Sequence, residues 1–184
     1  MIGLSINIDA SASAWKSAFP RLRQKIEQAA ALAFTRAKKP LAFKGRHFEV
    51  NILLTTDAAV KSLNHDYRGK NKPTNVLSFP QFDMHSFRKS HLESFPQKMT
   101  LPLGDVVLAH QTIRRECREQ SKDIESHTIH LVIHGTLHLL GYDHMRLKDA
   151  KIMERLECDI LATLGYSDPY HETKAKNGRR SRHG

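Results

Sequence analysis

Apolar and polar residues alternate in two stretches of the chain, one at its start and one near residue 50. The alternating apolar positions are Ile2, Leu4, Ile6 and Ile8, and then Phe48, Val50, Ile52 and Leu54. A period of two places such side chains on one face of a strand. Two shorter apolar runs, residues 76–79 and 106–109, predict a third strand that Pro80 ends and a fourth strand after Asp105. The pattern therefore predicts four short strands.

Other stretches repeat their apolar residues at the spacing of a helix. The predicted helices run from Trp15 to about Ala37, with a break or late start at Pro20, then through Val60 and Leu63, from Gln111 to Gln120, from Ser121 to Leu140 and from Ala150 to Leu164. Strands and helices do not alternate strictly, which favours one α+β domain with a small mixed four-stranded sheet and about five helices. Residues 81–102 follow no regular pattern and are expected to form a long loop, of a kind that is often functional or mobile.

The length and composition of the chain indicate a single domain followed by a tail. The 184 residues, 40% of them apolar, suffice for one core, which we place in residues 1–166. Residues 167–184 form a basic tail that we expect to be disordered. No stretch approaches the roughly 18 apolar residues of a membrane span, and the start lacks a charged region followed by an apolar one, so we expect a cytoplasmic protein. Two cysteines, Cys117 and Cys158, agree with a reducing compartment.

The chain carries a formal net charge of +10, from 29 Lys and Arg against 19 Asp and Glu. Residues 171–184 hold five basic residues and one acidic residue, which leaves a charge of +6 on the rest of the chain. A basic body favours polyanions, and nucleic acid is the commonest partner of that kind. The charge alone does not decide between RNA and other partners.

Three histidines around a glycine carry the candidate chemistry. His134 and His138 are one helical turn apart, so their side chains share a face and can grip one metal ion. Gly141 can adopt the positive φ that ends a helix, and the chain can then return His144 to the same ion. Three imidazoles suit Zn²⁺ and match a catalytic zinc site, whose fourth position holds water. We predict one zinc ion per chain, bound by His134, His138 and His144.

The spacing also matches the long zinc-protease motif His-Glu-x-x-His-x-x-Gly-x-x-His, with one difference. Gly135 occupies the position of the glutamate that acts as general base in those proteases. The match therefore supports a zincin-like ligand geometry and argues against peptide hydrolysis. Nearby, His130 is a competing ligand candidate. Asp105 could orient a ligand histidine or cap a loop, and Asp143 could position water or a ligand ring.

Three motifs in order resemble the YbeY family of bacterial metal-dependent endoribonucleases. They are the stretch from His134 to His144, residues 63–80 (LNHDYRGKNKPTNVLSFP) and residues 103–107 (LGDVV), within a resemblance that spans roughly residues 51–164. The resemblance implies a cytoplasmic enzyme of ribosomal RNA maturation and ribosome quality control. It implies that His134, His138 and His144 bind zinc, that His130 supports them, and that Arg68 is functional. The small ribosomal subunit and its RNA are the implied partners, with ribosomal proteins and assembly GTPases as further candidates.

Arg68 by itself is more typical of a surface residue than of a phosphate ligand, and the family resemblance reverses this interpretation. A guanidinium donates paired hydrogen bonds to phosphoryl oxygens and keeps its proton, so with the resemblance we expect Arg68 to stabilise charge on the scissile phosphate. Zinc lowers the pKa of its bound water toward about 7, so phosphodiester hydrolysis needs no neighbouring glutamate.

Two alternatives stay open, namely a zinc-containing ribosome-assembly factor without its own catalysis and an unusual metalloprotease without the usual glutamate. The oligomeric state cannot be read from the sequence.

Overall fold

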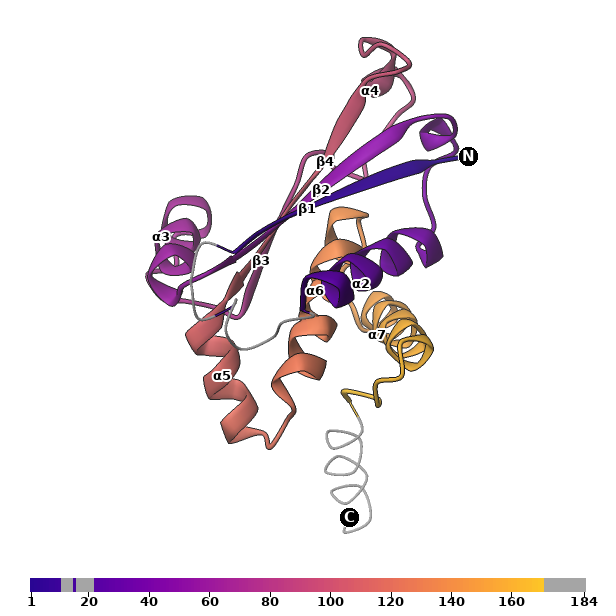
Figure 1. Ribbon diagram of the computed structural model, residues 1–184. Helices are drawn as coiled ribbons and strands as arrows, with labels where there is room; N and C mark the ends of the chain where they lie inside the picture. Colours follow the sequence, from indigo (N-terminus) through magenta and orange to yellow (C-terminus); the bar gives the residue numbers. More distant parts are fainter. Residues whose placement is uncertain (11–14, 16–21, 171–184) are drawn as a thin grey trace.

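Four strands form one mixed sheet in the computed structural model, which describes residues 1–10, 15 and 22–170 (Figure 1). The strands are β1 (Gly3–Ala10), β2 (His47–Thr55), β3 (Val76–Pro80) and β4 (Thr100–Ala109), in the spatial order β1-β2-β4-β3. β2 is parallel to β1 and to β4, whereas β3 is antiparallel to β4. The predicted α+β class and the four-stranded mixed sheet are confirmed.

β4 begins earlier than the sequence pattern predicts. We expected an irregular chain up to Pro102, but β4 starts at Thr100, and Pro102 pairs with Glu49 of β2. The pairing then shifts by one residue, so that Gly104 pairs with Val50 and Leu103 is the extra residue of a bulge. Gly104 has a φ of +141°, and a Cβ atom there would lie 2.3 Å from the carbonyl oxygen of Phe79. The bulge and the glycine explain how a strand continues past a proline.

Six α-helices lie in the described part of the chain, one more than the approximately five predicted. They are α2 (Leu22–Arg36), α3 (Asp57–Arg68), α4 (Ser90–Glu93), α5 (His110–Glu119), α6 (Ile124–Leu139) and α7 (Leu147–Thr163), and a 3-10 turn spans Leu41–Phe43. The additional helix is α4, a single turn inside the stretch that we expected to be irregular.

Trp15 is buried and its indole N–H donates to the carbonyl of Thr55, while residues 16–21, including Pro20, lie outside the described residues. Among the described residues, no helix is long and apolar enough to cross a membrane.

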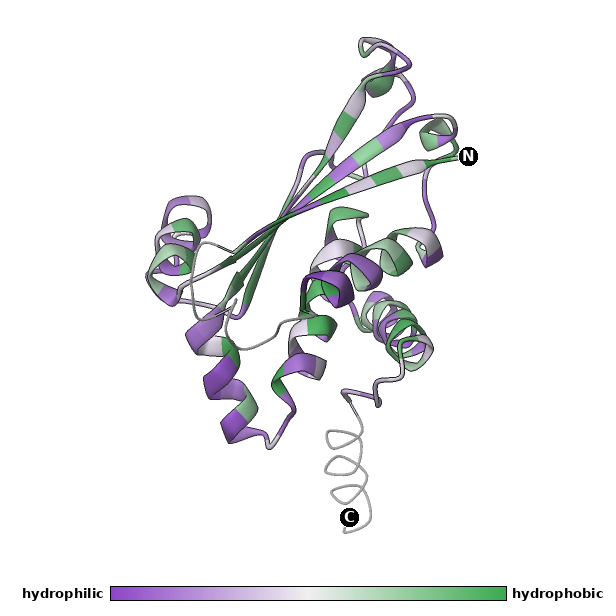
Figure 2. Ribbon diagram, viewed as in Figure 1, coloured by the Kyte–Doolittle hydropathy of each residue, from purple (hydrophilic) through white to green (hydrophobic). Residues whose placement is uncertain are grey.

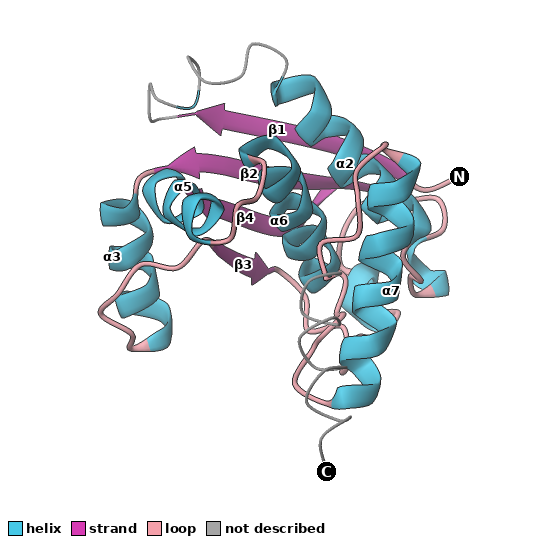
Figure 3. Cartoon of the chain, turned by 90° about the horizontal axis from the view of Figure 1, so that it is seen from below, coloured by secondary structure: helices cyan, strands magenta, loops and turns pink. Residues whose placement is uncertain are grey.

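The main core lies between one face of the sheet and the helices α2, α6 and α7 (Figures 1 and 3). The alternating residues of β2, from Phe48 to Leu54, point into it, as their period predicts. α6 occupies the centre of this layer, and its residues are buried on almost every side, which explains its apolar composition in Figure 2. α3 packs on the opposite face, where Val60 meets Leu77 and Val107.

Arg46 ties the stretch between β3 and β4 to the body of the protein. Its side chain is 5% exposed and donates to three backbone carbonyl groups. The acceptors are Leu92 at 2.7 Å, Phe95 at 3.0 Å and Pro96 at 2.7 Å. A long segment with little regular structure is therefore fastened by one buried guanidinium.

Candidate metal centre

The end of α6 and the turn after it bring the three predicted histidine ligands together. The Asp123 side chain begins the helix by accepting from the Ser126 N–H at 2.7 Å. The helix ends at Leu139, and Gly141 adopts a φ of +85°, as its position after the apolar run predicts. The chain then turns back and places His144 beside the helix. His134 and His138 are partly buried, whereas His144 is exposed.

The three imidazole rings converge on one point. Their ring centroids are 4.5 Å apart for His134 and His138, 5.0 Å for His138 and His144, and 5.4 Å for His134 and His144. One nitrogen from each ring lies within 4.8 Å of the other two, an arrangement that could hold a metal ion. The expected juxtaposition of a helical pair and a third imidazole from the turn is therefore present.

The hydrogen bonds of His134 and His138 favour tautomers in which the Nε2 lone pairs of the two rings face each other. The Nε2 atoms of His134 and His138 are 3.0 Å apart. His134 has its Nδ1 2.8 Å from the buried carboxylate of Glu157, so its proton belongs on Nδ1. His138 forms a hydrogen bond with the backbone of Tyr142 that favours protonation, and a bond of this kind uses an imidazole N–H. Two facing nitrogens without a proton between them are a suitable donor pair for a cation.

Electrostatics keep His138 neutral. Burial lowers the pKa of His138 to about 4, with further lowering by the neighbouring His134 and His144 rings. Only the neutral imidazole has a lone pair for a metal. At neutral pH this side chain is therefore in its ligating form, and the residues present fit a divalent metal with nitrogen ligands.

A second group that could hold a metal lies directly behind His134. It consists of His130, His134 and Glu157. Glu157 is fully buried on α7, and its Oε2 atom lies 3.0 Å from Nε2 of His130. The two clusters share His134, whose Nε2 faces the first group and whose Nδ1 faces the second.

Arg68 and the three histidines line the same pocket. The pocket has a volume of about 570 Å³. Its other lining residues are Thr74 to Pro80, Asp143 and Met145. Arg68 is the last residue of α3, which Gly69 ends with a φ of +66°. The Arg68 side chain is exposed and forms no hydrogen bond or ion pair with any described residue, so its donors are available to a ligand in the pocket.

The two acidic residues that we considered near the ligands have different positions. Asp143 lines the pocket, and its side chain accepts from the N–H groups of His144 at 2.7 Å and Met145 at 3.3 Å, which stabilises the returning turn. Asp105 accepts from the Asn51 side chain at 2.8 Å. Alternation along β4 directs Asp105 to the face of the sheet opposite α6, so neither role predicted for it is correct.

The family model described as "Endoribonuclease YbeY" matches residues 9–165. The chain belongs to the endoribonuclease YbeY family. The protein is therefore an endoribonuclease, a hydrolase that acts on RNA, and the family resemblance predicted from the three sequence motifs is confirmed.

Relatives named endoribonuclease YbeY match most of the chain. The protein from Sinorhizobium medicae (strain WSM419) is 41% identical over 174 residues, which cover 92% of this chain and 96% of the relative. That from Rhizobium etli (strain CIAT 652) is 45% identical over 142 residues, or 77% of each chain. The solution structure of TM1509 from Thermotoga maritima aligns with a TM-score of 0.47 and 21% identity over 90% of this chain and 98% of that one.

Glu157 is the residue of the candidate site that the sequence analysis did not identify. The last predicted helix carries several acidic residues, and the sequence alone assigns a role to none of them. One signal was present, because Glu157 occupies the same helical stripe as the buried residues Met153, Ile160 and Leu161. A carboxylate in an apolar stripe needs a buried partner, and the histidines of α6 were the candidates.

Proposed function

We propose that this endoribonuclease is zinc-dependent and cleaves single-stranded regions of ribosomal RNA during maturation of the small-subunit 3′ end and in ribosome quality control. His134, His138 and His144 bind one zinc ion, and Arg68 binds the scissile phosphate. The observation that carries the proposal is the convergence of three imidazoles in a pocket that Arg68 also lines, without a hydrogen bond or ion pair to any residue that the structure describes. Three nitrogen ligands leave room for a further ligand, as a catalytic zinc site requires.

In this proposal, the bound metal and the side chains of the pocket have different roles. Bound zinc supplies a Lewis acid that makes water more acidic and withdraws charge from a phosphoryl oxygen. Arg68 donates hydrogen bonds to the phosphate in the ground state and to the greater charge of the transition state. Asp143 keeps the turn that carries His144 in place through its two backbone hydrogen bonds. The exposed position of Arg68 at the end of α3 leaves it accessible to an extended RNA strand.

The proposed partners are the RNA of the small ribosomal subunit, the subunit itself, and in addition ribosomal proteins and assembly GTPases, in the cytoplasm. The net charge of +10 supports a polyanionic partner. Membership of an endoribonuclease family argues against an assembly factor without catalysis and against a protease. The absence of a carboxylate at Gly135 also argues against a protease.

Elemental analysis of the purified protein, beside cleavage of precursor ribosomal RNA with and without a chelator, tests the proposal. We expect about one zinc ion per chain and cleavage that the chelator abolishes and added zinc restores. H138A should lose both the metal and the cleavage. R68A should retain the metal and the RNA but lose cleavage by about 100- to 1,000-fold, the loss typical of a group that stabilises transition-state charge.

The matched control for R68A is R155A, because Arg155 is an exposed arginine on α7 that does not line the pocket. It should cleave like the wild type. If R68A and H138A stay folded and cleave normally, the proposed site is wrong. Cleavage of a peptide without any effect on RNA would instead favour the protease alternative.

A further inference from the structure

Glu157 connects α7 to the back of the metal centre. Its side chain has no exposure to solvent, and each of its two oxygens meets a different histidine of α6. Oε1 is 2.8 Å from Nδ1 of His134, and Oε2 is 3.0 Å from Nε2 of His130. Burial alone would raise the pKa of Glu157, but the hydrogen bonds with His130 and His134 outweigh it and lower the pKa to about 2. The side chain is therefore an ionised acceptor at neutral pH.

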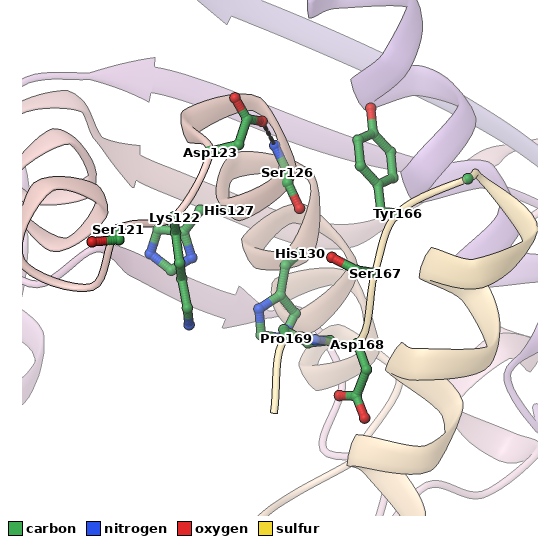
Figure 4. A pocket seen from close by; sticks show the side chains of 11 residues that line it. Ser121, Lys122, Asp123, Ser126, His127, His130, Tyr166, Ser167, Asp168 and Pro169 are labelled. Atoms are coloured by element: carbon green, nitrogen blue, oxygen red, sulfur yellow. Dashed lines mark hydrogen bonds between the residues drawn. The ribbon is translucent and has the colours of Figure 1, made fainter. Parts of the chain in front are cut away.

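The segment after α7 adds a third donor to this carboxylate. Residues 165–169 and the start of α6 line a pocket of about 580 Å³, and Figure 4 shows His130 between the helix and this segment. The segment delivers Tyr170, whose hydroxyl donates to Oε2 of Glu157 and lies 3.2 Å from Nε2 of His130. Ser167 to Tyr170 are thus placed against the domain, although we expected them in the disordered tail. Residues 171–184 of that predicted tail lie outside the described residues.

The chemistry of this cluster differs from that of the three-histidine cluster. Donors and acceptors are complementary here, because two imidazole N–H groups and one phenol O–H point at a carboxylate. These donors satisfy the Glu157 carboxylate without a cation, although Nδ1 of His130 is buried without a hydrogen-bond partner. With the His134 proton on Nδ1 and the His138 proton donated to the Tyr142 backbone, the two Nε2 atoms, 3.0 Å apart, both present lone pairs that a cation would satisfy. The two groups that could hold a metal are therefore one ligand cluster and one supporting cluster, joined at His134.

We propose that Glu157, held by Tyr170 and His130, is a positioning residue that fixes the ring orientation and the Nδ1–H tautomer of His134, so that Nε2 points at the metal. This inference rests on the proposed metal site. A metal-binding imidazole commonly donates its second N–H to a carboxylate, and loss of such a partner lowers metal affinity by about 10- to 100-fold. Tyr170 belongs to this arrangement, which makes the residues after α7 part of the site.

Glu157→Gln is the direct test, because glutamine keeps the shape of the side chain. Its amide has one acceptor oxygen, so it can accept from only one of the two imidazoles, and its NH₂ group opposes the other N–H. We expect zinc affinity, measured by competition with a chromophoric chelator, to fall by about 10- to 100-fold. D159N is the matched control, since it removes an exposed carboxylate from the same helix, and its zinc affinity should equal that of the wild type.

Nitrogen chemical shifts of the histidine rings in metal-free protein provide a second measurement. The wild type should hold the His134 proton on Nδ1, and E157Q should lose this preference. Y170F keeps the carboxylate but removes the phenol donor, so its zinc affinity should fall by about 2- to 10-fold, the value of one hydrogen bond. If E157Q does not fold, the zinc affinity of Y170F tests the proposal.

The outcomes separate this proposal from the proposed function. Folded E157Q with wild-type zinc affinity, or with its His134 proton still on Nδ1, would overturn the positioning role. Two zinc ions in the wild type and one in E157Q would also overturn it, because Glu157 would then be a ligand. Zinc binding by H138A equal to that of the wild type would instead disprove the proposed metal site, and the nitrogen shifts of metal-free protein would then decide the role of Glu157.

Discussion

Gly135 on α6 packs directly against Val106 on β4. A Cβ atom at Gly135 would lie 2.6 Å from Cγ1 of Val106 and 3.1 Å from the hydroxyl of Ser78. The residue after the first predicted ligand, His134, therefore faces the sheet, and the helix approaches β4 too closely for any side chain there. The missing glutamate of the protease motif has a packing explanation as well as a chemical one.

G135A should destabilise the protein by about 1–3 kcal/mol, the usual cost of an added methyl group in a packed core. Urea unfolding followed by circular dichroism measures this change. Val106→Ala makes room for the new methyl group, so the double variant should be more stable than the sum of the two single changes predicts. Additive losses would show that the contact with Val106 does not limit this position.

Zinc should stabilise the folded protein, because the three ligands come together only in the native state. At a free zinc concentration of 100 times the dissociation constant, the gain is about 2.7 kcal/mol. For a chain of this size that corresponds to a rise in Tm of roughly 5–10 °C. Thermal unfolding with zinc and with a chelator measures the difference. H138A should show no rise, and an equal rise in H138A would place the bound zinc elsewhere.

G141A should be more harmful than G165A, although both glycines end a helix with a positive φ. Their φ values are +85° and +83°, but a Cβ atom at Gly141 would lie 2.4 Å from Cβ of Met84, whereas nothing lies within 4 Å at Gly165. We expect a loss of about 1 kcal/mol for G165A and about 2–4 kcal/mol for G141A in urea unfolding. G141A should also weaken zinc binding, because the same turn returns His144. Equal losses would contradict a role for the Met84 contact.

Tyr166 should make stability fall at alkaline pH. Burial raises the pKa of Tyr166 to about 12, and the hydrogen bond that it donates to Glu125 and the charge of that carboxylate add to the shift. The unfolded chain loses this proton near pH 10, so the neutral phenol favours the folded state below pH 10. The contribution is lost as the pH rises from 10 through 12.

Urea unfolding between pH 9 and pH 12 measures this loss. Y166F should lack the part of the decline that Tyr166 causes, and its absorbance at 295 nm should show one fewer tyrosine titrating near pH 12. Y67F is the control, because Tyr67 is 71% exposed. A decline of the same size in Y166F and the wild type would refute the assignment.

R46M should loosen the connection between β3 and β4. Methionine keeps much of the apolar stem but removes the guanidinium donor from the carbonyl groups of Leu92, Phe95 and Pro96. The Leu92 and Pro96 carbonyl groups then keep only the backbone hydrogen bonds that they accept in the turns of this segment. We expect a loss of about 2–4 kcal/mol in unfolding free energy and faster proteolysis within residues 81–99. R88M changes an exposed arginine of the same stretch and should do neither. Unchanged proteolysis of R46M would mean that other contacts hold this segment.

Local periodicity accounts for what the sequence predicted well. The alternation around Val50 and the helical spacing of His134, His138 and Gly141 are properties of short segments, and the structure retains them. The start of β4 was missed because it depends on pairing with β2, where tertiary contacts override the usual effect of Pro102. Arg46 was missed for the same reason, since its acceptors lie about 50 residues away.

The same distinction between local sequence patterns and long-range contacts applies to the proposed metal centre. The three predicted ligands lie within 11 consecutive residues, so their spacing was sufficient to bring them together. Glu157 lies 23 residues after His134 and Tyr170 lies 40 residues after His130, and only the packing of α7 and the following segment on α6 makes them neighbours. Arg68 comes from a third region, and the pocket that it shares with the histidines could be expected only from the family resemblance.

The three imidazoles differ in how firmly the protein holds them. His134 and His138 project from the central helix of the core, so their positions are set before any ion arrives, whereas His144 stands on a solvent-exposed turn. In the proposed zinc site, the helical pair would therefore bind the ion first and the third ring would then enclose it. Release of the ion from the proposed site would then require opening of this one short turn, which Asp143 holds with two backbone hydrogen bonds, and not unfolding of the whole domain.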